Sequence, residues 1–254
     1  MLSALMHQQS PDEIQRDKKM NLILLQPNDF VADDRVRLSG RRLAHVLAVH
    51  RAAVGDSLRV GLLDGLIGAG KVLALDSEKL ELEICLDQPP PPPLSVTLLL
   101  ALPRPKMLKR ILQCVTSLGV KQIYLLNSYR VEKSYWGSPL LQTEKLQEQL
   151  LLGLEQACDT IRPQVELRPR FKPFVEDELP QVAANSAAYV AHPLAACNCP
   201  IGSTGPVTLA IGPEGGFIPY EVDKLQDCGF TPISLGARIL RVETAVPVLL
   251  SRFG

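Results

Sequence analysis

Two apolar runs that end in glycine-bearing turns, both near the C-terminus, constrain the fold of this chain most strongly. In the first, Leu209–Ile211 leads directly into Gly212–Phe217, which reads Gly-Pro-Glu-Gly-Gly-Phe. In the second, Ser234–Gly236 leads into Ala237–Arg241 and then into a predicted helix. A short apolar run that stops at glycines is typical of a buried parallel strand that delivers its chain into a loop. Glycines there permit φ > 0 and close approach of a ligand, so the two loops predict a binding crevice in an α/β domain.

One glycine pair alone would be explained by an ordinary tight turn. Both runs together, in this order, resemble the cofactor-binding signature of RsmE-type SPOUT methyltransferases, which methylate N3 of a uridine in small-subunit ribosomal RNA. The resemblance is most specific over Leu209–Ala245 and weaker over the rest of the chain. It implies a C-terminal SPOUT α/β domain with a deep trefoil knot and S-adenosylmethionine (SAM) as the cofactor. It also implies a homodimer, because sites in that family are completed across a dimer interface.

The same resemblance assigns residues to the cofactor. The implied SAM-binding residues are His192, Leu209, Ile211, Gly212, Pro213, Glu214, Gly215, Gly216, Leu235, Gly236, Ile239 and Leu240. Glu214 has a second interpretation, as a solvated turn carboxylate. Backbone N–H and C=O groups of such loops can bind the edge of an adenine, which fits their small residues.

Three charged residues after the second glycine loop are the catalytic candidates. A uracil must lose its N3 proton to become nucleophilic, and a cation near its carbonyl oxygens would stabilise the anion. Arg241 is preferred for this role over Arg238. Glu243 is a candidate proton acceptor or the group that orients the arginine. Its alternative role is a carboxylate that interacts favourably with the start of a helix.

The first part of the chain has short apolar runs separated by turns. These runs are Arg35–Leu38, Ser57–Leu63, Gly70–Leu75 and Leu80–Leu86. Leu80–Ile84 alternates with period two, which predicts a strand with one solvent-facing side. Residues 20–88 are therefore expected to form a small β-barrel, which resembles the PUA-like RNA-binding domain of RsmE-type proteins. Residues 1–19 show no periodicity and are predicted to be a disordered extension.

Gly65–Val72 nearly matches a phosphate-binding P-loop. Val72 stands where a Ser or Thr hydroxyl must bind Mg²⁺, and a strand rather than a helix is predicted to follow. A glycine-rich hairpin is the favoured interpretation, which argues against nucleotide-dependent phosphoryl transfer.

A run of prolines, residues 89–93, favours extended polyproline II geometry and predicts a linker between two domains. Beyond it, residues 94–254 alternate predicted strands with predicted helices. The helices are expected at Met107–Leu118 and Thr143–Ala157, and the strands at Leu94–Leu102, Ile123–Leu126, Val165–Leu167, Tyr189–Ala191 and Val207–Ile211. This alternation predicts a parallel α/β sheet.

Four residues of the second domain depart from the family pattern. Cys114 and Ser117 replace the usual Lys and Glu of a Gln-Lys-x-Thr-Glu-Leu-Gly helix, and Cys158 and Asp159 replace the Gly and Arg of Glu-Gln-x-Gly-Arg. These departures leave two alternatives open. One is a SAM-dependent enzyme with a different RNA target, and the other is a non-catalytic RNA-binding or ribosome-assembly factor on the same scaffold.

The charge balance does not decide the question of an RNA partner. The chain has 27 Lys and Arg and 27 Asp and Glu, whereas strongly electrostatic RNA binders are usually basic. RNA contacts are predicted at Arg35, Arg41, Arg104, Lys106, Arg110, Arg130 and Lys133, with a solvated surface as the alternative for each. The expected partner is ribosomal RNA or the small ribosomal subunit.

Six scattered cysteines form no disulfide framework, and Cys197-Asn198-Cys199 lacks the spacing of a metal site, so no metal is predicted. Reduced thiols indicate a cytoplasmic protein. No apolar run reaches the roughly 18 residues that a membrane span needs, so no membrane partner is expected.

Overall fold

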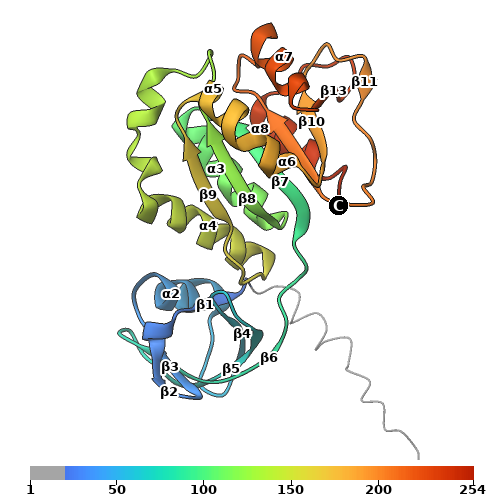
Figure 1. The fold of residues 1–254 in the computed structure, drawn as a ribbon. Coiled ribbons are helices and arrows are strands. Elements are labelled where there is room, and N and C mark those ends of the chain that lie inside the picture. The colour runs from blue at the N-terminus through green and yellow to red at the C-terminus, as the bar shows by residue number, and fades with distance from the viewer. Residues whose placement is uncertain (1–20) are drawn as a thin grey trace, which may run out of the picture. The chain divides into compact units, whose positions relative to one another are not determined.

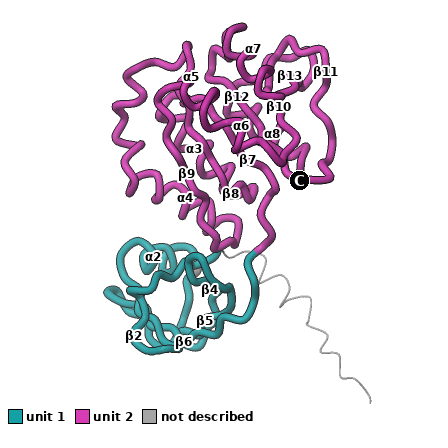
Figure 2. The backbone as a smooth tube through the Cα atoms, in the orientation of Figure 1, with its two compact units in different colours: residues 1–90 teal, residues 91–254 magenta. Residues whose placement is uncertain are grey.

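The computed structural model describes residues 21–254. The chain divides into two compact units, residues 1–90 and 91–254, and the division falls inside the proline run (Figure 2). The expected disordered extension and Met20 lie outside the described residues. Within residues 21–254, no helix is both long enough and apolar enough to cross a membrane.

Unit 1 is built on one mixed sheet. Its strands are β1 (Ile23–Leu25), β2 (Phe30–Ala32), β3 (Arg35–Leu38), β4 (Ser57–Leu62), β5 (Ile67–Leu75) and β6 (Leu80–Gln88), in the order β1-β4-β5-β6-β3-β2. β1 and β4 pair in parallel, and the other neighbours are antiparallel. The sheet curves into a half-barrel (Figure 1), and within residues 21–90 no ladder joins β1 to β2. The short helices are η1 (Pro27–Asp29), α2 (Gly40–His45) and the π-helix η2 (Val46–His50).

The glycines of the near-P-loop belong to the β4–β5 hairpin. A Cβ on Gly68 would lie 1.8 Å from the backbone oxygen of Cys85, and one on Gly70 would lie 3.0 Å from Val60. These glycines therefore allow β5 to pack closely on β6 and on the core. Since strand β5 continues through Val72, no helix N-terminus is present to bind a phosphate.

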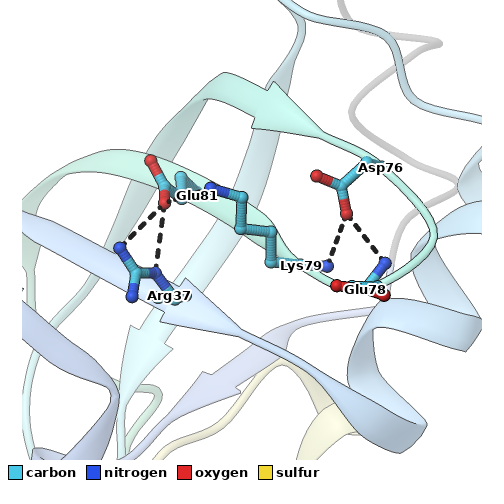
Figure 3. A network of polar contacts seen from close by, with 5 residues as sticks. All are labelled: Arg37, Asp76, Glu78, Lys79 and Glu81. Atoms are coloured by element: carbon cyan, nitrogen blue, oxygen red, sulfur yellow. Dashed lines mark hydrogen bonds and ion pairs between the residues drawn. The ribbon is translucent and has the colours of Figure 1, made fainter.

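The period-two alternation predicted for Leu80–Ile84 is confirmed where β6 begins, because Leu80 and Leu82 are buried while Glu83 is exposed. The turn before β6 is tied by Asp76, whose Oδ1 accepts hydrogen bonds from the Glu78 and Lys79 amides at 2.8 and 2.9 Å (Figure 3). These backbone donors lower the pKa of the Asp76 carboxyl.

Unit 2 is a parallel α/β domain, as the sequence predicts. Its strands are β7 (Leu94–Ala101), β8 (Val120–Leu126), β9 (Gln164–Arg168), β10 (Ala187–Ala191), β11 (Cys197–Asn198), β12 (Val207–Ile211) and β13 (Thr231–Ser234). All ladders are parallel, in the order β11-β13-β10-β12-β7-β8-β9. The main helices are α3 (Pro105–Ser117), α4 (Thr143–Ala157), α7 (Pro219–Asp227) and α8 (Val242–Leu250). Shorter ones are η3 (Lys133–Gly137), η4 (Pro139–Leu141), α5 (Phe171–Pro173), η5 (Phe174–Glu178) and α6 (Leu179–Ala183).

The centre of this sheet fixes where a ligand can bind. All five residues of β12 are buried, and β12 lies between β7 and β10. Apolar side chains on both faces give such a strand its near-continuous hydrophobic sequence. Because the strands are parallel, β10, β12 and β13 deliver their following loops to the same edge, where ligands of α/β sheets usually bind.

The helices α3 and α4 cross at a close contact. A Cβ on Gly153 of α4 would lie 2.7 Å from the Thr116 Cβ of α3. The Ser117 hydroxyl donates to the Gly153 carbonyl at 3.1 Å, and the Gln113 side chain donates to the buried Gln149 side chain at 2.8 Å. The departure at Ser117 thus belongs to the packing of these two helices.

Candidate functional site

A cavity of about 480 Å³ opens at the carboxyl edge of the unit 2 sheet, beside the ends of β10, β12 and β13. All of the cofactor residues expected from the sequence except Leu209 line it. They are His192, Ile211, Gly212, Pro213, Glu214, Gly215, Gly216, Leu235, Gly236, Ile239 and Leu240. The fold therefore brings His192 and two loop segments, residues 211–216 and 235–240, to one site.

Leu209 lies deeper, within strand β12. Its side chain is fully buried, and its register partners are Leu98 of β7 and Tyr189 of β10. Leu209 therefore supports the strand that delivers the loop, two residues before the cavity begins at Ile211.

The first glycine loop folds back on itself tightly. A Cβ on Gly212 would lie 2.7 Å from the Phe217 amide nitrogen and 3.0 Å from the backbone of Gly216. Gly216 has φ +71°, and its amide donates to the Pro213 carbonyl at 2.8 Å. Glycine is required at residue 212 for space and favoured at residue 216 for conformation.

Two neighbouring loops hold the first glycine loop in place. The Glu214 carboxylate accepts a hydrogen bond from the Arg104 amide at 3.0 Å, which ties it to the segment between β7 and α3. On the other side, the Arg130 guanidinium donates to the Gly215 carbonyl. A Cβ on Gly215 would lie 2.8 Å from the Arg130 Cδ, so the arginine stem packs directly on this glycine.

The second glycine loop connects β13 to α8. Gly236 has φ +101°, and Arg238 and Ile239 line the cavity with exposed side chains. Arg241 caps α8, because its carbonyl accepts the Thr244 and Ala245 amides at 2.9 and 2.8 Å. Arg241 is exposed, and neither it nor the half-buried Glu243 is among the cavity-lining residues, whereas Arg238 is.

His192 fixes the end of β10. Its amide donates to the Ile233 carbonyl of β13 at 2.9 Å, and its Nδ1 accepts the Leu194 amide at 3.3 Å. The imidazole thereby organises the turn that forms one wall of the cavity.

The residues predicted to contact RNA occupy both units. Arg130 lines the cavity, Arg104, Lys106 and Arg110 are exposed between β7 and the first turns of α3, and Lys133 is exposed in η3. Arg35 and Arg41 are exposed in unit 1.

Comparison with known proteins places this geometry in a family. Residues 90–254 match the family model described as RNA methyltransferase domain. Ribosomal RNA small subunit methyltransferase E of Treponema pallidum is 30% identical over 239 residues, which cover 89% of this chain and 87% of the relative. The chain belongs to the RsmE-type family of RNA methyltransferases.

Other RsmE-type proteins are similar over most of their length. The Synechocystis relative is 29% identical over 240 residues, covering 87% of this chain and 73% of the relative. A crystal structure of the Neisseria gonorrhoeae protein, bound to S-adenosyl methionine, has a TM-score of 0.70 at 22% identity and covers 91% of this chain and 95% of that one. The last comparison shows that the fold is shared.

The departures from the RsmE-type pattern are not among the residues that line the cavity. Cys158 ends α4 in the left-handed conformation, with φ 54°. Asp159 is buried, forms an ion pair with Lys121 at 2.5 Å and accepts the Ile161 amide at 2.9 Å. Asp159 is thus a structural residue with its own counter-charge.

Sequence reasoning missed several residues of the RsmE-type cavity. Phe217 lines it, as do Pro193 and Leu194 after β10. Each lies at or just after the carboxyl end of a strand or in a glycine loop, so the strand ends were the signal that would have found them. Glu221 was also missed. Its buried carboxylate accepts the Tyr129 amide at 2.7 Å and the Ile218 amide at 3.0 Å.

Proposed function

We propose that this chain is a SAM-dependent methyltransferase that acts on N3 of a uridine in small-subunit ribosomal RNA. The observation that carries the proposal is the cavity formed by the two glycine loops, in a chain that belongs to the RsmE-type family. The names of the relatives support ribosomal RNA as the substrate. The N3 position follows from the resemblance of the sequence.

The residues of the cavity fit SAM. A Cβ on Gly216 would meet no heavy atom within 4 Å, so the space beside this peptide unit is open to a ligand. Ile211, Leu235 and Leu240 supply apolar surface beside these polar backbone groups. SAM carries its own leaving group and supplies the methyl cation equivalent, so the protein has to bind, orient and help remove a proton.

Arg238 is the best-placed cation for the uracil. It lines the cavity and forms no ion pair within residues 21–254. A guanidinium at the uracil carbonyl oxygens would stabilise the charge that develops as N3 loses its proton. We therefore prefer Arg238 over Arg241, which is the opposite of the order that the sequence suggested. Arg241 and Glu243, at the start of α8, are proposed to contact the RNA or to position the second glycine loop.

Two finer features of the architecture are part of the proposal. Unit 1 is proposed to be a PUA-like RNA-binding domain, supported by its curved mixed sheet. A deep trefoil knot is proposed at the end of unit 2. Strand β13 lies between β10 and β11 while β12 lies beyond β10, so the chain must cross back over earlier segments. Exposed Arg35 and Arg41 of unit 1 and Arg104, Lys106, Arg110, Arg130 and Lys133 of unit 2 are the proposed RNA contacts.

A homodimer is proposed because large apolar side chains are exposed beside the cavity. Leu194 and Ile239 are 86% and 81% exposed, and both line the cavity rim. Apolar side chains gathered at one place on a surface indicate a protein interface. The proposed location is the cytoplasm, where ribosomal RNA is assembled into subunits.

The test is methyl transfer from labelled SAM to small-subunit ribosomal RNA, followed by nuclease digestion and identification of the modified nucleoside. N3-methyluridine at one position is the expected product. A different methylated nucleoside would support the alternative of another RNA target. SAM binding without any methyl transfer would support the non-catalytic alternative.

A further inference from the structure

An exposed tyrosine stands beside the cavity on a segment that is held firmly in place. Tyr129 is 79% exposed and lies in the loop after β8. Ser128, directly before it, and Val131, two residues after it, are buried. Its amide donates to the buried Glu221 carboxylate at 2.7 Å, and the next residue, Arg130, donates its guanidinium hydrogen to the Gly215 carbonyl. The backbone of Tyr129 is therefore fixed on both sides while its ring faces solvent.

A second exposed ring belongs to the same part of the surface. Tyr220 is 48% exposed in the first turn of α7 and precedes Glu221 directly. It follows the cavity-lining Phe217 by three residues. The bond from the Tyr129 amide to Glu221 joins the two tyrosine-bearing segments. Among the described aromatic pairs the two rings do not stack on each other.

The charges nearby indicate the chemistry of that partner. Arg130 lines the cavity next to Tyr129, and Arg104 is exposed in the segment that binds Glu214. Neither arginine forms an ion pair within residues 21–254. Exposed aromatic rings interleaved with unpaired cations are typical of surfaces that bind single-stranded nucleic acid, where bases stack on the rings and phosphates meet the cations.

We propose that Tyr129, with Tyr220 beside it, is a stacking platform for a nucleotide that flanks the target uridine. This inference rests on the proposed function, because it needs an RNA substrate at the cavity. A base that undergoes chemistry must leave its stack, and the stacking energy that its neighbours lose is recovered on aromatic side chains. Tyr129 thus contributes to RNA binding, while the glycine loops bind the cofactor.

The test uses the full chain and small-subunit ribosomal RNA as the methyl acceptor. Tyr129→Ala is expected to raise the KM for RNA about tenfold, because it removes one stacked ring, with the SAM affinity unchanged. Tyr129→Phe keeps the ring and is expected to stay within about twofold of the wild type. Leu118→Ala is the matched control, since Leu118 is 38% exposed at the opposite end of the sheet, before β8.

A spectroscopic readout separates stacking from a merely structural role. Tyr129→Trp adds an indole to a chain with one native tryptophan. Its fluorescence is expected to be quenched on addition of a uridine-rich single-stranded oligoribonucleotide, while that of the wild type changes little. Tyr220→Ala is expected to weaken RNA binding less than Tyr129→Ala, because its ring is less exposed.

Each other outcome overturns the inference in a distinct way. An unchanged KM for RNA in Tyr129→Ala, with methyl transfer intact, would refute the platform and leave the proposed function standing. A change in oligomeric state of Tyr129→Ala, measured by light scattering, would identify the ring as part of a protein interface instead. No methyl transfer by the wild type would remove the proposed function and this inference with it.

Discussion

Two arginines of unit 1, Arg37 and Arg42, differ in their surroundings from two that line the cavity of unit 2, Arg130 and Arg238. In unit 1, Arg37 pairs with Glu81 of the neighbouring strand at 3.1 Å (Figure 3), and Arg42 forms a two-pronged pair with buried Asp29 at 2.5 and 2.6 Å. Beside the cavity, Arg130 and Arg238 form no ion pair within residues 21–254.

This difference assigns the two sets of arginines different functions. A guanidinium that is satisfied by a local carboxylate contributes to the fold of its own unit and has little charge left for RNA. An unpaired guanidinium beside a cavity retains its charge for a ligand. Residues 20–90 contain eight Lys and Arg and ten Asp and Glu, so unit 1 does not attract RNA by its net charge. The cations that matter most for the reaction are expected in unit 2.

The largest expected effect comes from removing space in the first glycine loop. Gly212→Ala places a Cβ 2.7 Å from the Phe217 amide nitrogen, so the loop must open. SAM affinity measured by calorimetry is expected to fall by more than about 100-fold, which corresponds to about 3 kcal/mol. Gly205→Ala is the matched control, because a Cβ there meets no heavy atom within 4 Å. Equal SAM affinity in the two variants would contradict the description of the loop.

The next largest effect is on kcat, and it differs between the two arginines of the second glycine loop. Arg238→Ala is expected to lower kcat about 100-fold with little change in SAM affinity, because it removes a charge at the cavity. Arg241→Ala, outside the cavity, is expected to lower kcat by less than about tenfold. Single-turnover methylation of small-subunit ribosomal RNA measures both. A larger loss in Arg241→Ala would restore the order of preference that the sequence suggested.

A smaller effect on stability is expected in unit 1. Arg42→Ala leaves the Asp29 carboxylate, whose side chain is 10% exposed, without its cation, although the Gln26 amide still donates to it at 2.6 Å. The free energy of unfolding of unit 1 is expected to fall by about 2–3 kcal/mol. Arg37→Ala breaks a pair in which the arginine is 55% exposed, and about 0.5 kcal/mol or less is expected. Native-state hydrogen exchange of the β3 and β6 amides measures both variants. An equal loss of unfolding free energy in the two variants would contradict the claim that the buried pair stabilises unit 1 more than the exposed pair.

The smallest effect is an acid dependence of unit 1. Lys79, and then Arg37, lower the pKa of Glu81 below its ordinary value of 4.5, and backbone donors lower that of Asp76 below 3.8. Both carboxyls have a lower pKa in the folded chain than in the unfolded chain. Their ionised forms therefore stabilise unit 1 above the pKa of the unfolded chain, and this stabilisation is lost as the pH falls through the pKa of the folded chain. The melting temperature of unit 1 is expected to fall slightly below about pH 4, and less in Glu81→Gln. If the melting temperature had the same pH dependence in the wild type and in Glu81→Gln, the ionised Glu81 carboxylate would contribute nothing to the stability of unit 1.

The sequence predicts the fold best where a pattern reflects local geometry. The helix expected at Thr143–Ala157 has those bounds in the structure, and the strand at Val207–Ile211 is also found as predicted. The two glycine loops were placed together because parallel strands release their loops at one edge. These patterns need no knowledge of distant partners.

The parts that the sequence could not predict depend on distant partners. The pairing of Arg42 with Asp29 and of Lys121 with Asp159 requires strands and loops to be placed first. The same holds for the finding that Arg238 rather than Arg241 lines the cavity, since the direction of each side chain depends on the path of the loop. Leu209 was assigned to the cofactor from the resemblance, whereas its register inside β12 buries it.

The most direct measurement of the central claim is amide hydrogen exchange of the full chain with and without SAM. The account predicts that SAM slows exchange in residues 211–217 and 234–242, which form the two glycine loops, and leaves β3 and β6 of unit 1 unchanged. Protection in unit 1 alone, or no protection in either glycine loop at saturating SAM, would contradict it.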